Sequence, residues 1–225
     1  MGRENQRQDL KEERRREILE AALHVFAKRG FDKATVDEVA ERAGLSKGAI
    51  YLYYKNKDAL FFSLFEQKMD EARGPIGRAM RSAESLPDLV RNVVTAQLEF
   101  LQSNAEFFRI FSSEQARFDL DFQSDFRRLL RRRFNAYIGE LGKAINRFIG
   151  PGRKELSRDL ALSLIGMMNT HTTDWIVNHR SEPLTQKIDL IVHLFLKGVQ
   201  QFVQESEQAP VGTASDGSQI SRRFE

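Results

Sequence analysis

The stretch of residues 35–57, TVDEVAERAGLSKGAIYLYYKNK, constrains the fold of this chain more than any other segment. Apolar residues recur at helical spacing from Val36 to Ala43, directly after Thr35, whose hydroxyl suits a helix N-cap. Gly44 follows where a helix end favours a left-handed residue, and Ser46 is placed to cap a second helix. This order predicts two short helices joined by a tight turn, which is a helix-turn-helix.

The second of these helices is expected to expose small and positively charged residues at its start. Lys47, Gly48 and Ala49 follow the cap, at the helix end that enters the major groove in this motif. Tyr51 and Tyr53 come next, together with lysines, and all of these side chains can donate to phosphate oxygens. The combination favours DNA binding over an ordinary core hairpin.

Residues 14–60 resemble the DNA-binding domain of the TetR family of bacterial repressors; beyond them the resemblance rests only on length and an all-helical pattern. Tyr54 departs from the family pattern, which usually has Phe there, so its role stays open between core residue and phosphate donor. The residues that carry the resemblance are Thr35, Val39, Ala40, Ala43, Gly44, Leu45, Ser46, Gly48, Tyr51, Tyr53, Lys57 and Leu60. The DNA contacts expected from motif and resemblance together are Arg14, Thr35, Ser46, Lys47, Gly48, Ala49, Tyr51, Tyr53, Tyr54 and Lys57.

Charge adds little to this expectation. The net charge is +3, and residues 1–60 hold 13 Lys and Arg against 11 Asp and Glu. Arg14 to Arg16 stand at the start of the first expected helix, where two interpretations are equally good. They form a solvated turn neutralised by neighbouring glutamates, or they contact phosphates from the helix that crosses the DNA backbone.

The whole chain reads as all-α, with about nine helices and no strand-like alternation. A three-helix helix-turn-helix DNA-binding domain is expected over residues 1–55, a larger helical effector-binding and dimerisation domain over 56–204, and a disordered tail over 205–225. Residues 1–10 are expected to be mobile, and Gly74-Pro75 to break or kink the fourth helix. Outside the helix-turn-helix, helices are expected near residues 11–28, 56–73, 87–103, 104–111, 118–149, 154–179 and 184–204.

The last two expected helices look like a docking pair. The helix over 154–179 is apolar or small on more than one face, so it needs more than one packing partner. In TetR-like proteins the corresponding helices form a four-helix bundle with a second subunit. The resemblance therefore implies a homodimer, which matches a palindromic operator with half-sites about 34–36 Å apart or a multiple of that.

The 17 phenylalanines are frequent between Phe61 and Phe134. For each of them taken singly, an ordinary helical core is the better interpretation. The family resemblance nevertheless implies a pocket among these helices, and its apolar lining suits a small hydrophobic or aromatic effector. The candidate ligand-binding residues are Phe65, Phe100, Phe107, Phe108, Phe111, Phe126, Met167, His171 and Trp175.

Metal, cofactor and enzyme chemistry find no support in the sequence. His171 and Asp174 lie three residues apart, but no third ligand is in view, so a surface or buried polar pair is favoured over a metal site. Cysteine is absent, and so are a glycine-rich phosphate loop, an HExxH pair and a nucleophile elbow. The arginine run over residues 127–133 is expected to face solvent or pair with Asp119, Asp121 and Asp125, with an anionic site as the less favoured alternative.

No signal peptide or membrane-length apolar run is seen, so a cytoplasmic protein is expected. The sequence as a whole predicts a ligand-responsive transcriptional regulator. Repression is carried over from the family resemblance. The alternative is an effector-binding or docking protein whose helix-turn-helix no longer reads DNA.

Overall fold

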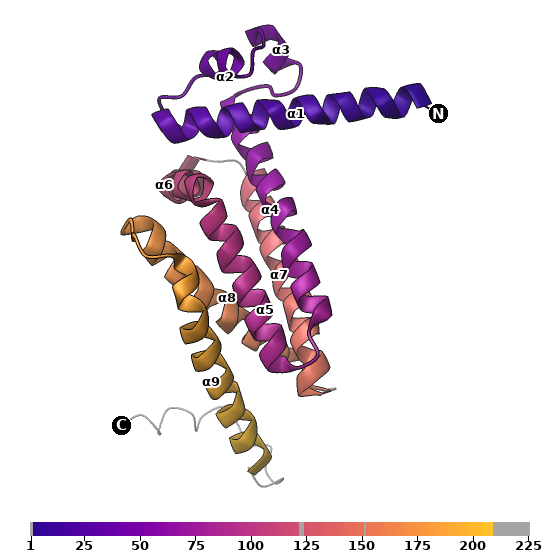
Figure 1. Ribbon diagram of the computed structural model, residues 1–225, viewed down its shortest axis with the longest axis vertical. Coiled ribbons are helices and arrows are strands. Elements are labelled where there is room, and N and C mark those ends of the chain that lie inside the picture. Colours follow the sequence, from indigo (N-terminus) through magenta and orange to yellow (C-terminus); the bar gives the residue numbers. More distant parts are fainter. Residues whose placement is uncertain (1, 122–123, 151, 209–225) are drawn as a thin grey trace.

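The computed structural model describes residues 2–121, 124–150 and 152–208. Every regular element in these ranges is helical, with nine α-helices and one short 3-10 helix, as expected for an all-α chain. Figure 1 shows α1 lying across the end of a bundle formed by the later helices, with α2 and α3 on its far side. The elements are α1 Gly2–Arg29, α2 Val36–Arg42, α3 Lys47–Tyr51, α4 Lys57–Ser82, α5 Leu86–Ser103, α6 Ala105–Asp121, α7 Ser124–Ile149, α8 Lys154–Val177, η1 Leu184–Lys187 and α9 Ile188–Gln208.

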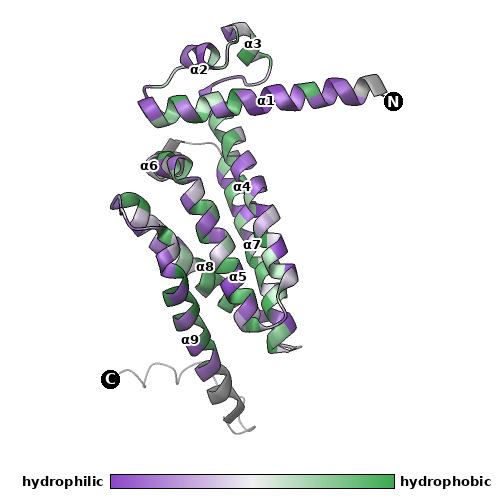
Figure 2. Ribbon diagram, in the orientation of Figure 1, coloured by the Kyte–Doolittle hydropathy of each residue, from purple (hydrophilic) through white to green (hydrophobic). Residues whose placement is uncertain are grey.

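Helix α1 is longer than the sequence pattern indicated, because residues 2–10 continue it toward the N-terminus. These residues are mostly Arg, Gln, Glu and Leu, which have high helix propensity and can extend a helix already formed by its packed C-terminal half. Side chains from Asn5 to Glu17 are exposed, whereas Ile18, Ala22 and Phe26 are fully buried. Figure 2 shows the same division, with a largely hydrophilic N-terminal half projecting beyond the domain.

The helix-turn-helix forms as predicted. The Thr35 hydroxyl accepts the Glu38 N–H and the Glu38 carboxylate accepts the Thr35 N–H, which completes a capping box at the start of α2. Gly44 has a φ of 66°, a conformation that other residues adopt only with strain, and so permits the tight turn. Ser46 caps α3 by accepting the Ala49 N–H at 3.2 Å.

Helix α4 joins the helix-turn-helix to the rest of the molecule and begins with an N-cap from Asn56. It runs without interruption through Gly74 and Pro75 to Ser82, where the sequence predicted a break or a kink. The single long helix expected over 118–149 is two elements, because residues 118–121 belong to α6 and α7 begins at Ser124. Helix α9 continues to Gln208, past residue 205 where the tail was expected to start, and residues 209–225 lie outside the described part.

The C-terminal bundle packs α7 along α8 and α5 against α4 and α9. Fully buried side chains of α5, α7 and α8 fill its centre, including Leu98, Leu141 and Leu164. Helix α6 packs against both α1 and α8, so the DNA-binding unit rests on the bundle through α4 and α6. One continuous core therefore runs through the two parts of the molecule.

Candidate DNA-binding surface and internal cavity

The start of α3 forms the exposed tip of the helix-turn-helix. Gly48 and Lys47 are exposed and Ala49 is partly buried, so small side chains leave the helix backbone accessible. The Lys47 ammonium lies 2.8 Å from an Asp37 carboxylate oxygen, and this hydrogen bond raises the pKa of Lys47. Asp37 is an acidic neighbour of the reading helix that sequence reasoning did not single out, although its place in α2 was visible.

Tyr51, at the end of α3, and Tyr53 and Tyr54, which follow it, have different environments. Tyr51 is 46% exposed and Tyr53 is partly buried, so both hydroxyls remain near the surface. Tyr54 is only 6% exposed, and burial raises the pKa of its hydroxyl. The structure therefore places the Tyr54 ring in the core, where the family usually has Phe. Leu52, which sequence reasoning passed over, is 82% exposed beside Tyr51.

Lys57 was expected to contact phosphate, but the structure gives its ammonium an internal role. Nζ donates to the backbone carbonyls of Phe31, Asp32 and Ala34 at 2.6, 2.9 and 3.0 Å. It also lies 4.6 Å from the centre of the Phe31 ring, close enough for a cation–π interaction. An ammonium has three N–H donors, so these carbonyls satisfy it without DNA.

The remaining expected DNA contacts are exposed. Thr35 is exposed at the start of α2, although its hydroxyl also serves the capping box. Arg14 is exposed on α1 and forms an ion pair of 2.6 Å with Glu17. Lysine and arginine pairs of this surface type are weak, so a phosphate can replace the carboxylate as partner.

A cavity of about 560 Å³ lies among α4, α5, α6, α7 and α8. Its size falls within the range of about 300–1,000 Å³ typical of ligand sites. Four of the nine expected ligand-binding residues line it, namely Phe65, Phe100, Phe108 and Phe111. Its other lining residues are Met69, Ala72, Arg73, Ile76, Gly77, Gln97, Leu101, Leu130, Arg131, Arg133, Phe134, Ala136, Tyr137, Glu140, Ile165 and Asn169.

The other five expected residues are not part of the cavity wall. Phe107 and Phe126 are buried behind it, where their rings pack against Phe65. Met167 and His171 lie on α8, and the indole N–H of Trp175 in the same helix donates to the Glu182 carbonyl at 2.8 Å. The wall residues contributed by α7 recur at helical spacing from Leu130 to Glu140, which was a detectable signal in the sequence.

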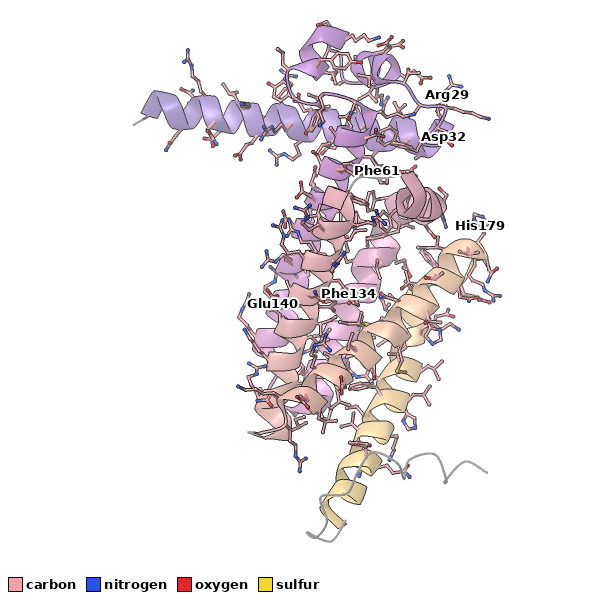
Figure 3. The ribbon with its side chains drawn as sticks, turned by 180° about the vertical axis from the view of Figure 1, so that it is seen from behind. Arg29, Asp32, Phe61, Phe134, Glu140 and His179 are labelled. Atoms are coloured by element: carbon pink, nitrogen blue, oxygen red, sulfur yellow. The ribbon has the colours of Figure 1, made fainter. Side chains whose placement is uncertain are left out.

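The cavity carries polar groups of two kinds. Inside, the Tyr137 hydroxyl donates to Gln97 Oε1, and burial raises the pKa of Tyr137. Toward the surface, Arg133 pairs with Asp70 at 2.7 Å, and Arg131 is exposed without an ion pair among the described residues. Figure 3 shows α7 presenting Phe134 and Glu140 along this side of the bundle. A ligand here would meet an apolar interior and a positively charged edge.

A chain of aromatic rings links the cavity to the helix-turn-helix. Phe111 lines the cavity and stacks on Phe61, with ring centroids 6.5 Å apart. Phe61 contacts Phe31 at 5.1 Å and Phe26 at 6.1 Å, and both of these belong to the core beneath α2 and α3. Figure 3 places Phe61 where α4 leaves that core.

The described part of the chain offers neither a metal site nor a membrane-spanning helix. No group of three or more histidine, aspartate and glutamate side chains is close enough there to hold a metal ion. Asp174 accepts hydrogen bonds from Arg180 and Asn178, which lower its pKa. None of the described helices combines the length and the apolar character needed to cross a membrane.

Comparison with known proteins places these features in context. Residues 18–64 match the model of bacterial regulatory proteins of the tetR family. The fatty acid metabolism regulator protein of Bacillus subtilis is 24% identical over 81% of this chain and 94% of its own length. An HTH-type transcriptional repressor of Mycobacterium tuberculosis is 37% identical over 43% of this chain and 50% of its own length.

Solved structures share this fold over most of the chain. The transcriptional regulator FadR from Bacillus subtilis, solved in complex with stearoyl-CoA, superimposes with a TM-score of 0.66 at 20% identity, covering 81% of this chain and 97% of that one. At this identity the likeness concerns the fold. The match over residues 18–64, which include the capped helix-turn-helix, identifies the chain as a helix-turn-helix transcriptional regulator of the tetR family.

Proposed function

We propose that this chain is a homodimeric repressor that binds a palindromic operator and is released by an amphipathic acyl ligand held in the cavity. The observation that carries the proposal concerns Phe111, which lines the cavity and also stacks on Phe61 of α4. Phe61 in turn contacts Phe31 in the helix-turn-helix core. A ligand that moves this wall also moves the support of the reading helix.

The DNA contacts follow from the exposed tip of the helix-turn-helix. Lys47 and the small surface of Gly48 and Ala49 meet base edges in the major groove. Lys47 leaves Asp37 for DNA, which an exposed ion pair permits. The phosphate contacts are assigned to Arg14, Thr35, Ser46, Tyr51 and Tyr53.

Helices α8 and α9 supply the surface for a second subunit. Leu190 and Leu194 are 45% and 53% exposed on one face of α9, and Gly198 continues that face with open space above it. Along α8, Gly166 is likewise exposed and open, and Val177 is exposed further along the helix. Apolar and small residues in this arrangement allow close packing of helices, which supports a four-helix bundle between two copies.

The effector class is inferred from the cavity and from a relative. Phenylalanine, leucine and isoleucine side chains suit a hydrocarbon chain, whereas Arg131 suits an anionic group at the surface. The Bacillus subtilis regulator with the same fold was solved with stearoyl-CoA, which has both parts. A fatty acyl thioester is therefore the most specific candidate.

Release requires that the ligand bind one arrangement of the dimer better than the other. Filling the cavity separates α4 from α6 and α7, and the shift passes through Phe111 and Phe61 into the core that supports α3. In a dimer this changes the distance between the two reading heads, which must match successive major grooves.

The test uses the full chain and two ligands. Immobilised protein is incubated with bacterial genomic DNA fragments at low salt, and retained fragments are sequenced for a palindrome. Mobility shifts on that palindrome are then repeated with stearoyl-CoA and with coenzyme A, which lacks the acyl chain. Two chains bound per palindrome and release by stearoyl-CoA alone are expected. Failure to retain any DNA would favour the docking protein instead, and retention without release would reject the acyl effector.

A further inference from the structure

Gln97 is a buried polar residue in the wall of a cavity that is otherwise mainly apolar. It lies on α5 and is 8% exposed, with the aromatic rings of Phe100 and Phe108 in the same wall. Its partner is Tyr137 on α7, whose hydroxyl donates to Gln97 Oε1. Burial raises the pKa of Tyr137, so this hydroxyl remains a neutral donor near neutral pH.

The hydrogen bond from Tyr137 determines which atom of the Gln97 amide is available to a ligand. The carbonyl oxygen is engaged by the hydroxyl, so the amide nitrogen carries two N–H donors for other partners. No acceptor for this nitrogen is found among the described residues. Among those residues, every side-chain nitrogen or oxygen that is fully buried has a hydrogen-bond partner. Because Nε2 has none, it is not fully buried and must reach open space. The open space beside Gln97 is the cavity.

An amide donor that faces an apolar cavity favours a ligand with a hydrogen-bond acceptor at that position. Burying the donor under a hydrocarbon without a hydrogen bond carries a desolvation penalty, whereas an acceptor oxygen removes it. The donor is uncharged, so a neutral carbonyl is a sufficient partner and a full negative charge is unnecessary.

We propose that Gln97 donates from Nε2 to the carbonyl oxygen of an acyl ligand, with Tyr137 as the positioning residue that holds the amide in this orientation. The assignment rests on the proposed acyl effector and adds where the acyl group is recognised. The hydrocarbon chain lies against the phenylalanines, the carbonyl meets Gln97, and the anionic part lies toward Arg131.

Two probes that differ only at the carbonyl test this assignment. Stearoyl-CoA has a thioester, and S-octadecyl-CoA replaces its carbonyl with a methylene group. Titration calorimetry on the full-length protein should give a dissociation constant about threefold to tenfold lower for the thioester, as expected for one neutral hydrogen bond. Gln97→Met should bind both probes equally. Gln102→Met is the matched control on α5, because Gln102 is outside the cavity wall, and it should keep the wild-type preference.

Tyr137→Phe tests the positioning role. Without the hydroxyl the amide can turn its oxygen to the cavity, so the preference for the thioester should shrink while S-octadecyl-CoA binding is retained. A general loss of packing would weaken both probes alike.

The outcomes separate this inference from the proposed function. Equal affinity of wild type for the two probes, or an undiminished preference in Gln97→Met, would overturn the role of Gln97 and leave the acyl effector intact. Binding of neither probe by wild type would reject the acyl effector itself. If Gln97→Met fails to fold by circular dichroism, the wild-type comparison of the two probes decides.

Discussion

The rings of Phe61 and Phe111 lie nearly parallel, with an interplanar angle of 6° and centroids 6.5 Å apart. Phe61 also makes an edge contact with Phe31, at 5.1 Å and 64°. One side chain of α4 thus touches both the cavity wall and the core of the helix-turn-helix. Close-packed rings of this kind leave little free space into which one of them can move alone.

Replacing Phe61 by leucine should weaken the coupling between effector and DNA. Coupling between two sites typically changes affinity by about 5–150-fold. The measured quantity is the factor by which stearoyl-CoA lowers DNA affinity. In Phe61→Leu this factor should be smaller than in wild type by about threefold or more, because leucine cannot contact Phe111 and Phe31 together. DNA affinity measured by fluorescence anisotropy with and without ligand gives this factor. Phe148→Leu, near the far end of α7, is the control. An unchanged factor in Phe61→Leu would show that the signal takes another route.

Lys57→Met should reduce stability and leave the salt dependence of DNA binding unchanged. Methionine keeps the apolar stem but removes the ammonium that binds the three carbonyls of the loop before α2. A loss of about 2 kcal/mol is expected in urea unfolding, as for hydrogen bonds to a charged group. The slope of log affinity against log salt should match that of wild type. A slope lower by about one would instead assign Lys57 to a phosphate.

Asp37→Asn should strengthen DNA binding. The change removes a negative charge that holds Lys47 in the free protein and repels phosphates in the complex. Because the pair is exposed, the expected gain is about twofold to fivefold at low salt and less at high salt. Asp159→Asn on α8 makes the same change in net charge away from the reading helix, and it should have no such effect. Equal gains in both variants would make the effect one of total charge.

Glu38→Gln should change how stability depends on pH. The pKa of Glu38 is lowered from 4.5, first by the hydrogen bond from the Thr35 N–H and then by its hydroxyl. Since the folded pKa is depressed, the stabilisation is fully present above the unfolded value and is lost as pH falls through the folded value. Glutamine keeps the capping acceptor without the charge.

Thermal unfolding should be followed from about pH 7 to about pH 3. At neutral pH the melting temperature of wild type should exceed that of Glu38→Gln, and this difference should disappear below pH 4.5. Glu41→Gln is the control on the same helix, at an exposed carboxylate. A gap that stays constant across this range would mean that the charge of Glu38 does not contribute.

Arg131→Gln should weaken binding of stearoyl-CoA. Arg131 is exposed at the cavity edge and has no ion pair among the described residues, so an anionic group need not displace a carboxylate. An increase of about threefold to tenfold in the dissociation constant is expected for one partly solvated contact. Arg132→Gln, the neighbouring residue outside the wall, should bind as wild type does. Equal losses in the two variants would indicate a general effect of charge.

The helix-turn-helix could be predicted from the sequence because its signals are local. Thr35, Gly44, Ser46 and Asn56 act within a few residues of their own positions, so their caps and turn follow from residue type and spacing. The role of Lys57 depends on carbonyls 23–26 residues earlier, which no local pattern reveals.

The residues that line the cavity could be predicted from the sequence only in part. The phenylalanine-rich segments pointed to Phe65, Phe100, Phe108 and Phe111, because large apolar residues at helical spacing face the interior. Trp175 could not be assigned the same way, since α8 is apolar on several faces and its rotation is set by tertiary packing. Gln97 is one polar residue among buried ones, and its meaning appears only with Tyr137 opposite.

The three bonds from Lys57 also have a mechanical consequence. They tie the first turn of α4 to the loop between α1 and α2. A twist or slide of α4 therefore cannot be absorbed at this joint without breaking them. If the proposed effector shifts α4, the helix-turn-helix is therefore expected to move with the start of α4 as one rigid unit.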